Sequence, residues 1–162
     1  MAACNFREIL RVLTKHGVEF VVVGGVSAVL QGAPVNTFDL DVVHSTEAPN
    51  VEKLMEALAE LDAVYRLQPH RKLRPAASHL KSPGHQLLMT QFGPLDLLGR
   101  IGDGEGYHQI VGQADRMDIG DGLSVAVLTL VSLIRVKEAT AGEKDYAMLP
   151  ILKRTLAERD KK

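Results

Sequence analysis

The sequence has few of the features that mark secreted or membrane-embedded proteins. It contains a single cysteine, Cys4, so an internal disulfide framework is excluded and a reducing compartment is favoured. No apolar run reaches the roughly 18 residues that a membrane-spanning helix requires. The opening residues, MAACNFREIL, are interrupted by Arg7 and Glu8 and lack the pattern of a signal peptide. We therefore expect a cytoplasmic protein with no membrane partner.

A strong net charge is also lacking. The 162 residues include 19 basic and 20 acidic side chains, for a formal net charge of −1. Such a balance excludes polyanion binding through bulk charge alone. The length suits one domain with a proper core, and no internal repeat is visible, so we expect a single domain over residues 1–162.

Acidic residues are absent from one long stretch, residues 63–95, which is broken by prolines. Two interpretations stay open for this basic segment: a loop that meets the phosphates of a polyanionic acceptor such as RNA, or a solvated connector. Its histidines do not have metal-ligand spacing, so a zinc site is not expected. The basic residues of the segment are Arg66, Arg71, Lys72, Arg74 and Lys81.

The stretch Phe20–Val43, FVVVGGVSAVLQGAPVNTFDLDVV, organises the chain. Its first four residues are apolar and mostly β-branched, which predicts a short buried strand. Gly24 and Gly25 end that strand, and Ser27 can cap the short helical turn that follows. A second strand then carries two carboxylates.

Asp39 and Asp41 lie two residues apart on the predicted second strand, so their side chains share one face. Carboxylates spaced by roughly 7 Å at the end of a buried strand repel each other unless a cation lies between them. This arrangement predicts a metal site that needs a third ligand. The alternative is a strand–turn–strand whose aspartates only solvate a sheet edge.

A further carboxylate, Asp96, lies among leucines in the predicted strand Leu95–Leu98. A lone carboxylate there carries a large desolvation cost unless it is paired or binds metal. Asp96 is therefore a candidate third ligand, and the alternative is that it only caps a strand end.

These residues resemble the nucleotidyltransferase superfamily with a DNA polymerase β type of palm. That superfamily has Gly-Gly or Gly-Ser, about a dozen residues, and then Asp-x-Asp; here Val26 to Phe38 separate Gly25 from Asp39. The fuller pattern, GGVSAVLQG followed by TFDLDVV, is similar to the small single-domain branch that includes abortive-infection and toxin-type enzymes. Many of those have Arg-Asp-Leu-Asp, and Phe38 stands here in place of the arginine.

The resemblance implies an α/β fold of the α+β type, a mixed central sheet flanked by helices. It implies transfer of a nucleotidyl group from a nucleoside triphosphate to a hydroxyl of tRNA or a protein, with release of pyrophosphate. Two Mg²⁺ ions would be held by Asp39, Asp41 and Asp96, and Asp96 would also accept the proton of the acceptor hydroxyl. A toxin-like enzyme of this kind would have an antitoxin-like partner.

Nucleotide binding is expected to involve five further residues. Gly24 and Gly25 would let the triphosphate approach the backbone, and Ser27 would offer a hydroxyl and amides to the phosphates. Lys137 emerges beside the apolar stripe of a predicted helix over residues 128–141, where it either reaches a phosphate or extends to solvent. Lys144 matches a Lys-Asp pair of the toxin-like branch, although the arginine usual before that pair is absent.

The remaining segments show ordinary secondary-structure signals. We expect helices over residues 5–15 and from Pro49, a final helix that Pro150 starts or kinks, strands over residues 85–91 and 123–127, and turns at Asp103-Gly104 and at Gly120-Asp121-Gly122. Two other functions are weighed. One is a non-catalytic nucleotide-binding or partner-binding module that keeps this fold. An aminoglycoside-type resistance transferase is set aside, because the chain shows no extra acceptor domain.

Overall fold

The computed structural model describes residues 5–139 and 143–161, with the side chains of residues 143–146 left out of the description. Cys4 lies outside the described residues. The N-terminal half contains α1 (Phe6–Lys15), β1 (Phe20–Val23), α2 (Gly24–Leu30), β2 (Leu40–His44), α3 (Ala48–Glu60), β3 (Val64–Tyr65), α4 (Ala77–Leu80) and β4 (His85–Thr90). The remainder contains β5 (Gly93–Leu98), α5 (Tyr107–Ile110), β6 (Ala114–Asp118), β7 (Ser124–Leu128), α6 (Leu130–Ala139) and α7 (Glu143–Asp160).

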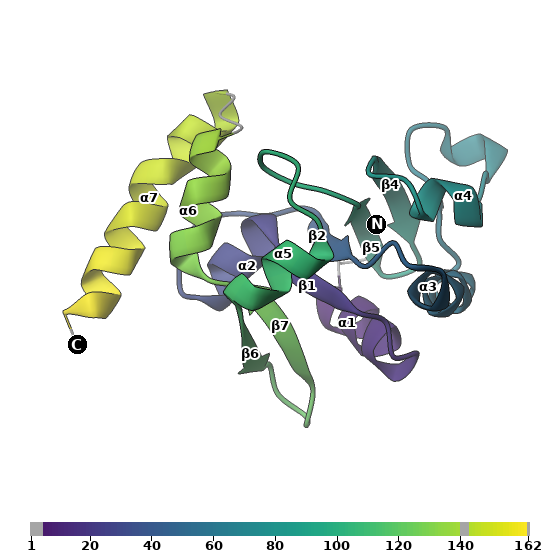
Figure 1. The fold of residues 1–162 in the computed structure, drawn as a ribbon, viewed down its shortest axis with the longest axis horizontal. Coiled ribbons are helices and arrows are strands. Elements are labelled where there is room, and N and C mark those ends of the chain that lie inside the picture. Colours follow the sequence, from purple (N-terminus) through teal and green to yellow (C-terminus); the bar gives the residue numbers. More distant parts are fainter. Residues whose placement is uncertain (1–4, 140–142, 162) are drawn as a thin grey trace.

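The strands form one mixed sheet in the order β3-β4-β5-β2-β1-β7-β6. At its centre β2 runs antiparallel to β1 and parallel to β5, and β1 runs parallel to β7. Figure 1 shows α6 and α7 side by side at one end of the molecule and α4 at the other. This architecture confirms the α/β fold with a mixed central sheet and flanking helices.

Alternation along the central strands divides the core into two clusters. Leu40 and Val42 of β2 join the cluster that contains the buried faces of α1 and α3. Val43 and, on β5, Leu98 join the cluster formed with α5, α6 and α7. Because side chains alternate between the faces of a strand, Asp41 and Asp96 lie on the second face.

Both turns expected between residues 101 and 122 are confirmed, one over residues 102–104 and one over residues 120–122. The turn at residues 120–122 joins β6 to β7, and Gly120 and Gly122 adopt φ values of 102° and 75°. The segment also contains α5 and the strand β6, whose sequence ADRMD has too few apolar residues to show a strand pattern. Tertiary pairing with β7 makes this polar segment an edge strand.

Pro150 does not start the final helix, which was one of the two roles expected for it. The helix begins at Glu143 and continues through Pro150, which lies inside α7. Among the helices that the structure describes, none combines the length and the apolar character needed to cross a membrane.

Candidate active site

Two carboxylates meet at the centre of the sheet. Asp41 on β2 and Asp96 on β5 are direct partners in the parallel register, so their side chains leave the same face at the same level. The two carboxyl groups are close enough to form a hydrogen bond when one is protonated. Asp39, just before β2, lies within electrostatic reach of Asp41. The sheet therefore brings the predicted Asp41 and Asp96 together, with Asp39 near Asp41.

The surroundings of Asp41 raise the pKa of its carboxyl group. Burial raises the pKa of Asp41 from 3.8 to about 7, and the charge of Asp96, its hydrogen bond to Asp41 and the charge of Asp39 act in the same direction. The ammonium of Lys137 opposes the rise in the Asp41 pKa. A cation bound beside Asp41 would offset the burial and the neighbouring negative charges that raise this pKa.

The glycine pair keeps space open beside this carboxylate. Gly24 begins α2 with a φ of 65°, and a Cβ atom on it would collide with Oδ2 of Asp41. A Cβ atom on Gly25 would lie only 2.7 Å from Oγ1 of Thr37. Side chains at these positions would therefore displace the carboxylate and the segment that leads into β2.

A cavity of about 210 Å³ is lined by Asp39 and Asp41. It combines acidic, basic and apolar groups, which is the composition that binding of a charged organic molecule requires. Its lining residues are Gly25, Asn36, Thr37, Phe38, Asp39, Asp41, Lys137 and Met148. Larger cavities occur elsewhere, but this is the one that contains the two predicted aspartates of β2.

Arg66 is part of the site, although the sequence had grouped it with the basic segment. Its Nη2 atom lies 2.9 Å from Oδ1 of Asp96, and its Nη1 atom donates a hydrogen bond of 2.8 Å to the carbonyl of Leu88. The N–H groups of Arg66 are not directed at Oδ1, so this buried oxygen makes no hydrogen bond within the described part of the chain. The contact is an ion pair that leaves hydrogen-bonding capacity unused.

No signal in the sequence separates Arg66 from the other basic residues of the segment. Its position follows from the short strand β3, which adds to the sheet edge beside β4 and places residue 66 one strand away from β5. The two-residue length of β3 is too short for periodicity to reveal. Arg66 itself lies in the turn that follows β3, as expected for the basic segment, and only its contact with Asp96 was missed.

The oxygen atoms that these carboxylates offer are chemically suited to a hard divalent cation. Carboxylate oxygens are the ligands that Mg²⁺ prefers, Gly24 leaves room beside Asp41, and Oδ1 of Asp96 lacks a hydrogen bond. Across the described residues, however, no three His, Cys, Asp or Glu side chains are grouped as a complete metal cage. The ion pair with Arg66 occupies one side of Asp96.

The residues predicted to bind phosphate differ in whether they face the cavity. Lys137, on α6, is partly buried and lines the cavity. Ser27 is fully buried and its hydroxyl donates a hydrogen bond of 2.9 Å to the carbonyl of Gly24, so the expectation that this hydroxyl faces a phosphate is not met. The side chain of Lys144 lies outside the described residues.

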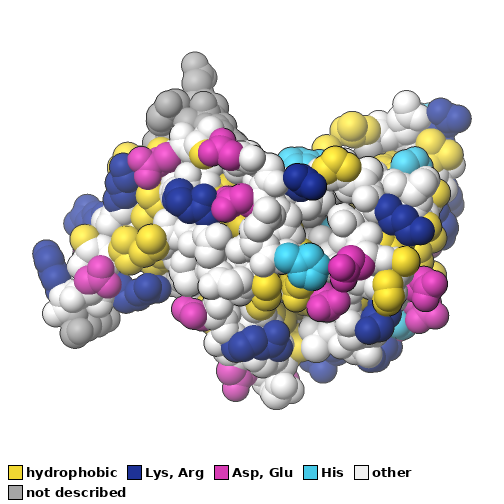
Figure 2. Space-filling model, in the orientation of Figure 1, with side chains coloured by type: hydrophobic (Ala, Val, Ile, Leu, Met, Phe, Trp, Pro, Cys, Tyr) yellow, Lys and Arg dark blue, Asp and Glu magenta, His cyan; other side chains and the backbone are white. Residues whose placement is uncertain are grey.

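The rest of the basic segment is distributed over the surface around α4. Arg74 pairs with Asp62, and Arg71 donates a hydrogen bond to the side chain of Gln68. Lys72 and Lys81 are exposed. On the face shown in Figure 2, basic and acidic side chains are interspersed over the molecule. The two interpretations of this segment, acceptor contact or solvated connector, both stay predictions.

Comparisons with known proteins identify the fold. The sequence matches no protein-family profile and no curated protein. Its structure is similar to TM1012 from Thermotoga maritima, which has a provisional assignment as a nucleotidyltransferase: the identity is 20%, the TM-score is 0.55, and the match covers 94% of this chain and 91% of that one.

Two antibiotic-modifying enzymes are also similar in structure. The lincosamide antibiotic adenylyltransferase LnuA, in its lincomycin-bound form, gives a TM-score of 0.59 at 14% identity, covering 91% of this chain and 94% of LnuA. The antibiotic-resistance factor ANT(2'')-Ia gives a TM-score of 0.60 at 12% identity, covering 93% and 82%. At such identities the likeness establishes architecture. The chain shares the fold of these three structures.

Proposed function

We propose that this protein transfers a nucleotidyl group from a nucleoside triphosphate to a hydroxyl-bearing acceptor and releases pyrophosphate. The observation that carries the proposal is the in-register pair Asp41–Asp96, with Asp39 near Asp41 and a cavity lined by Asp39, Asp41 and Lys137. The similarity in fold to adenylyltransferases supports the same reaction class.

In this proposal Asp39, Asp41 and Asp96 hold Mg²⁺. Two such ions, when bound, would offset the charge of the phosphates and stabilise the entering and leaving oxygens. The raised pKa of Asp41 and the unused oxygen of Asp96 are what a site that awaits a cation would show.

The residues around the carboxylates have separate tasks. Asp96 accepts the proton of the acceptor hydroxyl as the new oxygen–phosphorus bond forms and the bond to pyrophosphate breaks. Arg66, through its ion pair, fixes the position of the Asp96 carboxylate on β5. Lys137 attracts the triphosphate, and the backbone at Gly24 and Gly25 lets the phosphates approach closely.

The acceptor belongs to one of two classes. The toxin-like resemblance favours RNA or a protein, together with an antitoxin-like partner. The structural neighbours favour a small polyhydroxylated compound, because one is bound to lincomycin and another was solved with adenylyl-2''-tobramycin. An aminoglycoside-type transferase was set aside for lack of an extra acceptor domain, and these likenesses bring a small acceptor back into consideration, because the match covers 94% of LnuA and 82% of ANT(2'')-Ia.

A second candidate function is a nucleotide-binding module without turnover. The specific observation behind it is the ion pair of Arg66 with Asp96, which occupies a carboxylate that catalysis requires. In this case the nucleotide would bind, but no pyrophosphate would be released.

The decisive experiment measures pyrophosphate release from each of the four nucleoside triphosphates with Mg²⁺. Parallel reactions contain tRNA, a lincosamide or an aminoglycoside as the acceptor, and a chelator serves as the control. Release that requires Mg²⁺ and is lost in Asp41→Asn supports the transferase. Binding of nucleotide without release under all of these conditions supports the module, and absence of both rejects the two proposals together.

A further inference from the structure

Phe38 is placed in a way that packing does not explain. The residue is 75% exposed, although a phenylalanine side chain normally gains free energy by leaving water. It lies next to Asp39 at the entrance to β2 and lines the 210 Å³ cavity together with Asp41 and Lys137. An aromatic ring is thus held in water beside the charged groups of the candidate active site.

The backbone around Phe38 is anchored rather than loose. Thr37 packs against Gly25 and donates a hydrogen bond of 3.1 Å from its hydroxyl to the carbonyl of Asp39. Leu40, two residues after Phe38, is fully buried in the sheet. The anchors on both sides fix the position of Phe38 at the cavity, so the ring offers a preformed apolar face to a ligand there.

We propose that Phe38 stacks on the base of the bound nucleotide and contributes a large part of the nucleotide affinity. This inference rests on the proposed function, because it assigns the phosphates to the charged part of the cavity. The base is attached to those phosphates through the sugar, and every base has an aromatic face. An acceptor needs only a hydroxyl group, so the base is the one substrate component that is necessarily flat and aromatic.

The chain offers a clean reporter for this contact, because it contains no tryptophan. A Phe38→Trp variant places the only indole of the protein at the cavity. Titration of this variant with ATP and Mg²⁺, without acceptor, should change the indole fluorescence in a saturable way. Titration with inorganic tripolyphosphate and Mg²⁺ should fill the phosphate site with a much smaller change.

Calorimetry on the unlabelled protein measures the energetic share of the ring. Phe38→Ala should weaken ATP binding by roughly 5- to 150-fold, the range for loss of one base–aromatic stack, and leave tripolyphosphate binding unchanged. Phe38→Tyr should retain ATP affinity. Leu67→Ala is the matched control, because Leu67 is equally exposed, at 79%, but does not line the cavity.

The outcomes separate this inference from the proposed function. ATP binding that Phe38→Ala leaves intact overturns the stacking contact alone. Equal losses of ATP and tripolyphosphate affinity also overturn it, because the residue then shapes the phosphate site. Failure of the wild-type protein to bind either ligand overturns both proposals. Since Phe38 is exposed, the variants should fold like the wild type, which a thermal melt verifies.

Discussion

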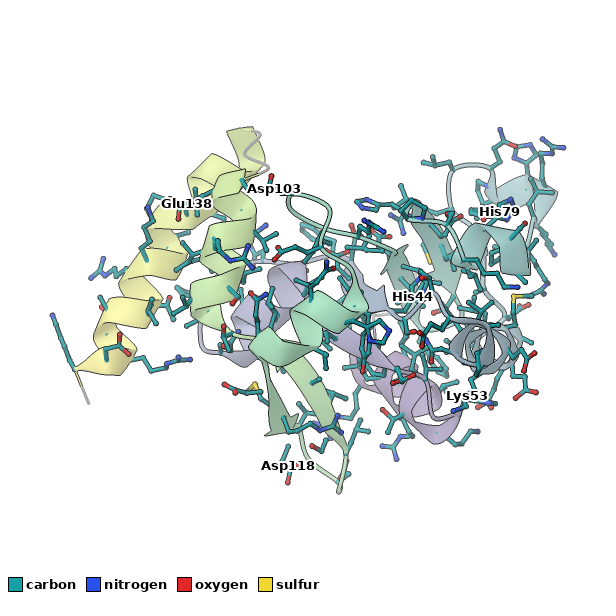
Figure 3. All side chains as sticks on the ribbon, viewed as in Figure 1. His44, Lys53, His79, Asp103, Asp118 and Glu138 are labelled. Atoms are coloured by element: carbon teal, nitrogen blue, oxygen red, sulfur yellow. The ribbon has the colours of Figure 1, made fainter. Side chains whose placement is uncertain are left out.

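The two ends of strand β2 differ in how well their buried polar groups are supplied with hydrogen-bond partners. At the start of the strand, Asp41 lies beside Asp96, and the negative charge of Asp96 makes ionisation of Asp41 less favourable. At the far end, His44 and Ser45 belong to a compact polar network with Asn50 of α3 and Glu19. Figure 3 labels His44 near the middle of the molecule, among the central strands.

The network at the far end is closely satisfied. The side chain of Asn50 is buried; it accepts a hydrogen bond of 2.7 Å from the amide of Glu19 and donates to the carbonyls of Glu19 and Ser45 at 3.2 and 2.8 Å. The ring of His44 donates through Nδ1 to the carbonyl of Ser45 at 3.1 Å. Buried polar groups of this kind stabilise the fold, because each one has replaced its water partners.

The comparison indicates where function lies. The chain satisfies a buried asparagine at one end of β2, whereas at the other end Oδ1 of Asp96 has no hydrogen bond within the described residues and Asp41 lies against a second carboxylate. We attribute the difference to the separate roles of the two ends. We interpret the far end as structural and the carboxylate end as the place where stability is given up for binding.

The largest expected effect is on activity at the carboxylate end. Asp41→Asn should lower nucleotidyl transfer by more than roughly 100-fold, the upper range for groups that only orient a metal ligand. Single-turnover pyrophosphate release measures it. Activity within a few-fold of wild type would place Asp41 outside the reaction.

The opposite result is expected at the far end. Asn50→Ala leaves the amide of Glu19 without a partner and removes one of two donors from each of the carbonyls of Glu19 and Ser45, so the free energy of unfolding should fall by about 1–3 kcal/mol. The change should not alter kcat or nucleotide affinity per folded molecule. Urea unfolding tests the loss of stability, and kinetics at low temperature test the unchanged activity. Loss of nucleotide affinity without loss of stability would contradict the structural role assigned to the far end.

The two ends should also respond to pH with opposite sign. In chelator, the folded pKa of Asp41, about 7, exceeds its unfolded value, so the folded state holds the extra proton. The stability from this group should decrease as pH rises from 4 to 7, by at most about 1.4 kcal/mol per pH unit. Burial lowers the pKa of His44, so the His44 end loses stability as pH falls below about 6.5.

Subtracting the unfolding free energy of Asp41→Asn from that of the wild type at each pH isolates Asp41, because both proteins contain His44. A difference that is flat between pH 4 and 7 would contradict the crowded carboxylate pair.

The smallest effects concern two ion pairs of the basic segment. Arg66→Gln removes the partner of the largely buried Asp96 and should cost about 1–2 kcal/mol, less than for a fully buried pair because Arg66 is partly exposed. Arg74→Gln removes the exposed pair with Asp62 and should cost under about 1 kcal/mol. Urea unfolding of both variants measures these losses. Equal losses would contradict the claim that the Arg66–Asp96 ion pair stabilises the fold more than the exposed Arg74–Asp62 pair.

Much of this arrangement was predictable from the sequence. The buried run Phe20–Val23, the glycine pair and the spacing to Asp39 indicated the strand–helix–strand unit, and the leucines around Asp96 indicated its strand. Local pattern suffices where apolar periodicity and glycine geometry decide the structure.

The missed features depend on tertiary contacts. Arg66 reaches the site only because a two-residue strand adds to the sheet edge, and β6 is a polar strand held by pairing with β7. Ser27 was expected to face phosphate, but its hydroxyl bonds back to Gly24 inside the helix. Whether the Ser27 hydroxyl bonds to the backbone or to a ligand depends on the packing around α2, and the spacing of residues in the sequence does not predict it.

The most direct test of the central claim compares thermal melts of the wild type and Asp41→Asn at pH 8, in chelator and in Mg²⁺ with ATP. Asp41 is a cleaner probe than Asp96, because Asp96→Asn would also leave Arg66 unpaired. We expect Asp41→Asn to melt at or above the wild-type temperature in chelator, since one of two crowded charges is gone. Mg²⁺ with ATP at 100 times its Kd should stabilise the wild type by about 2.7 kcal/mol and the variant far less. A wild type indifferent to Mg²⁺ and ATP, with a variant destabilised equally in both buffers, would contradict the claim.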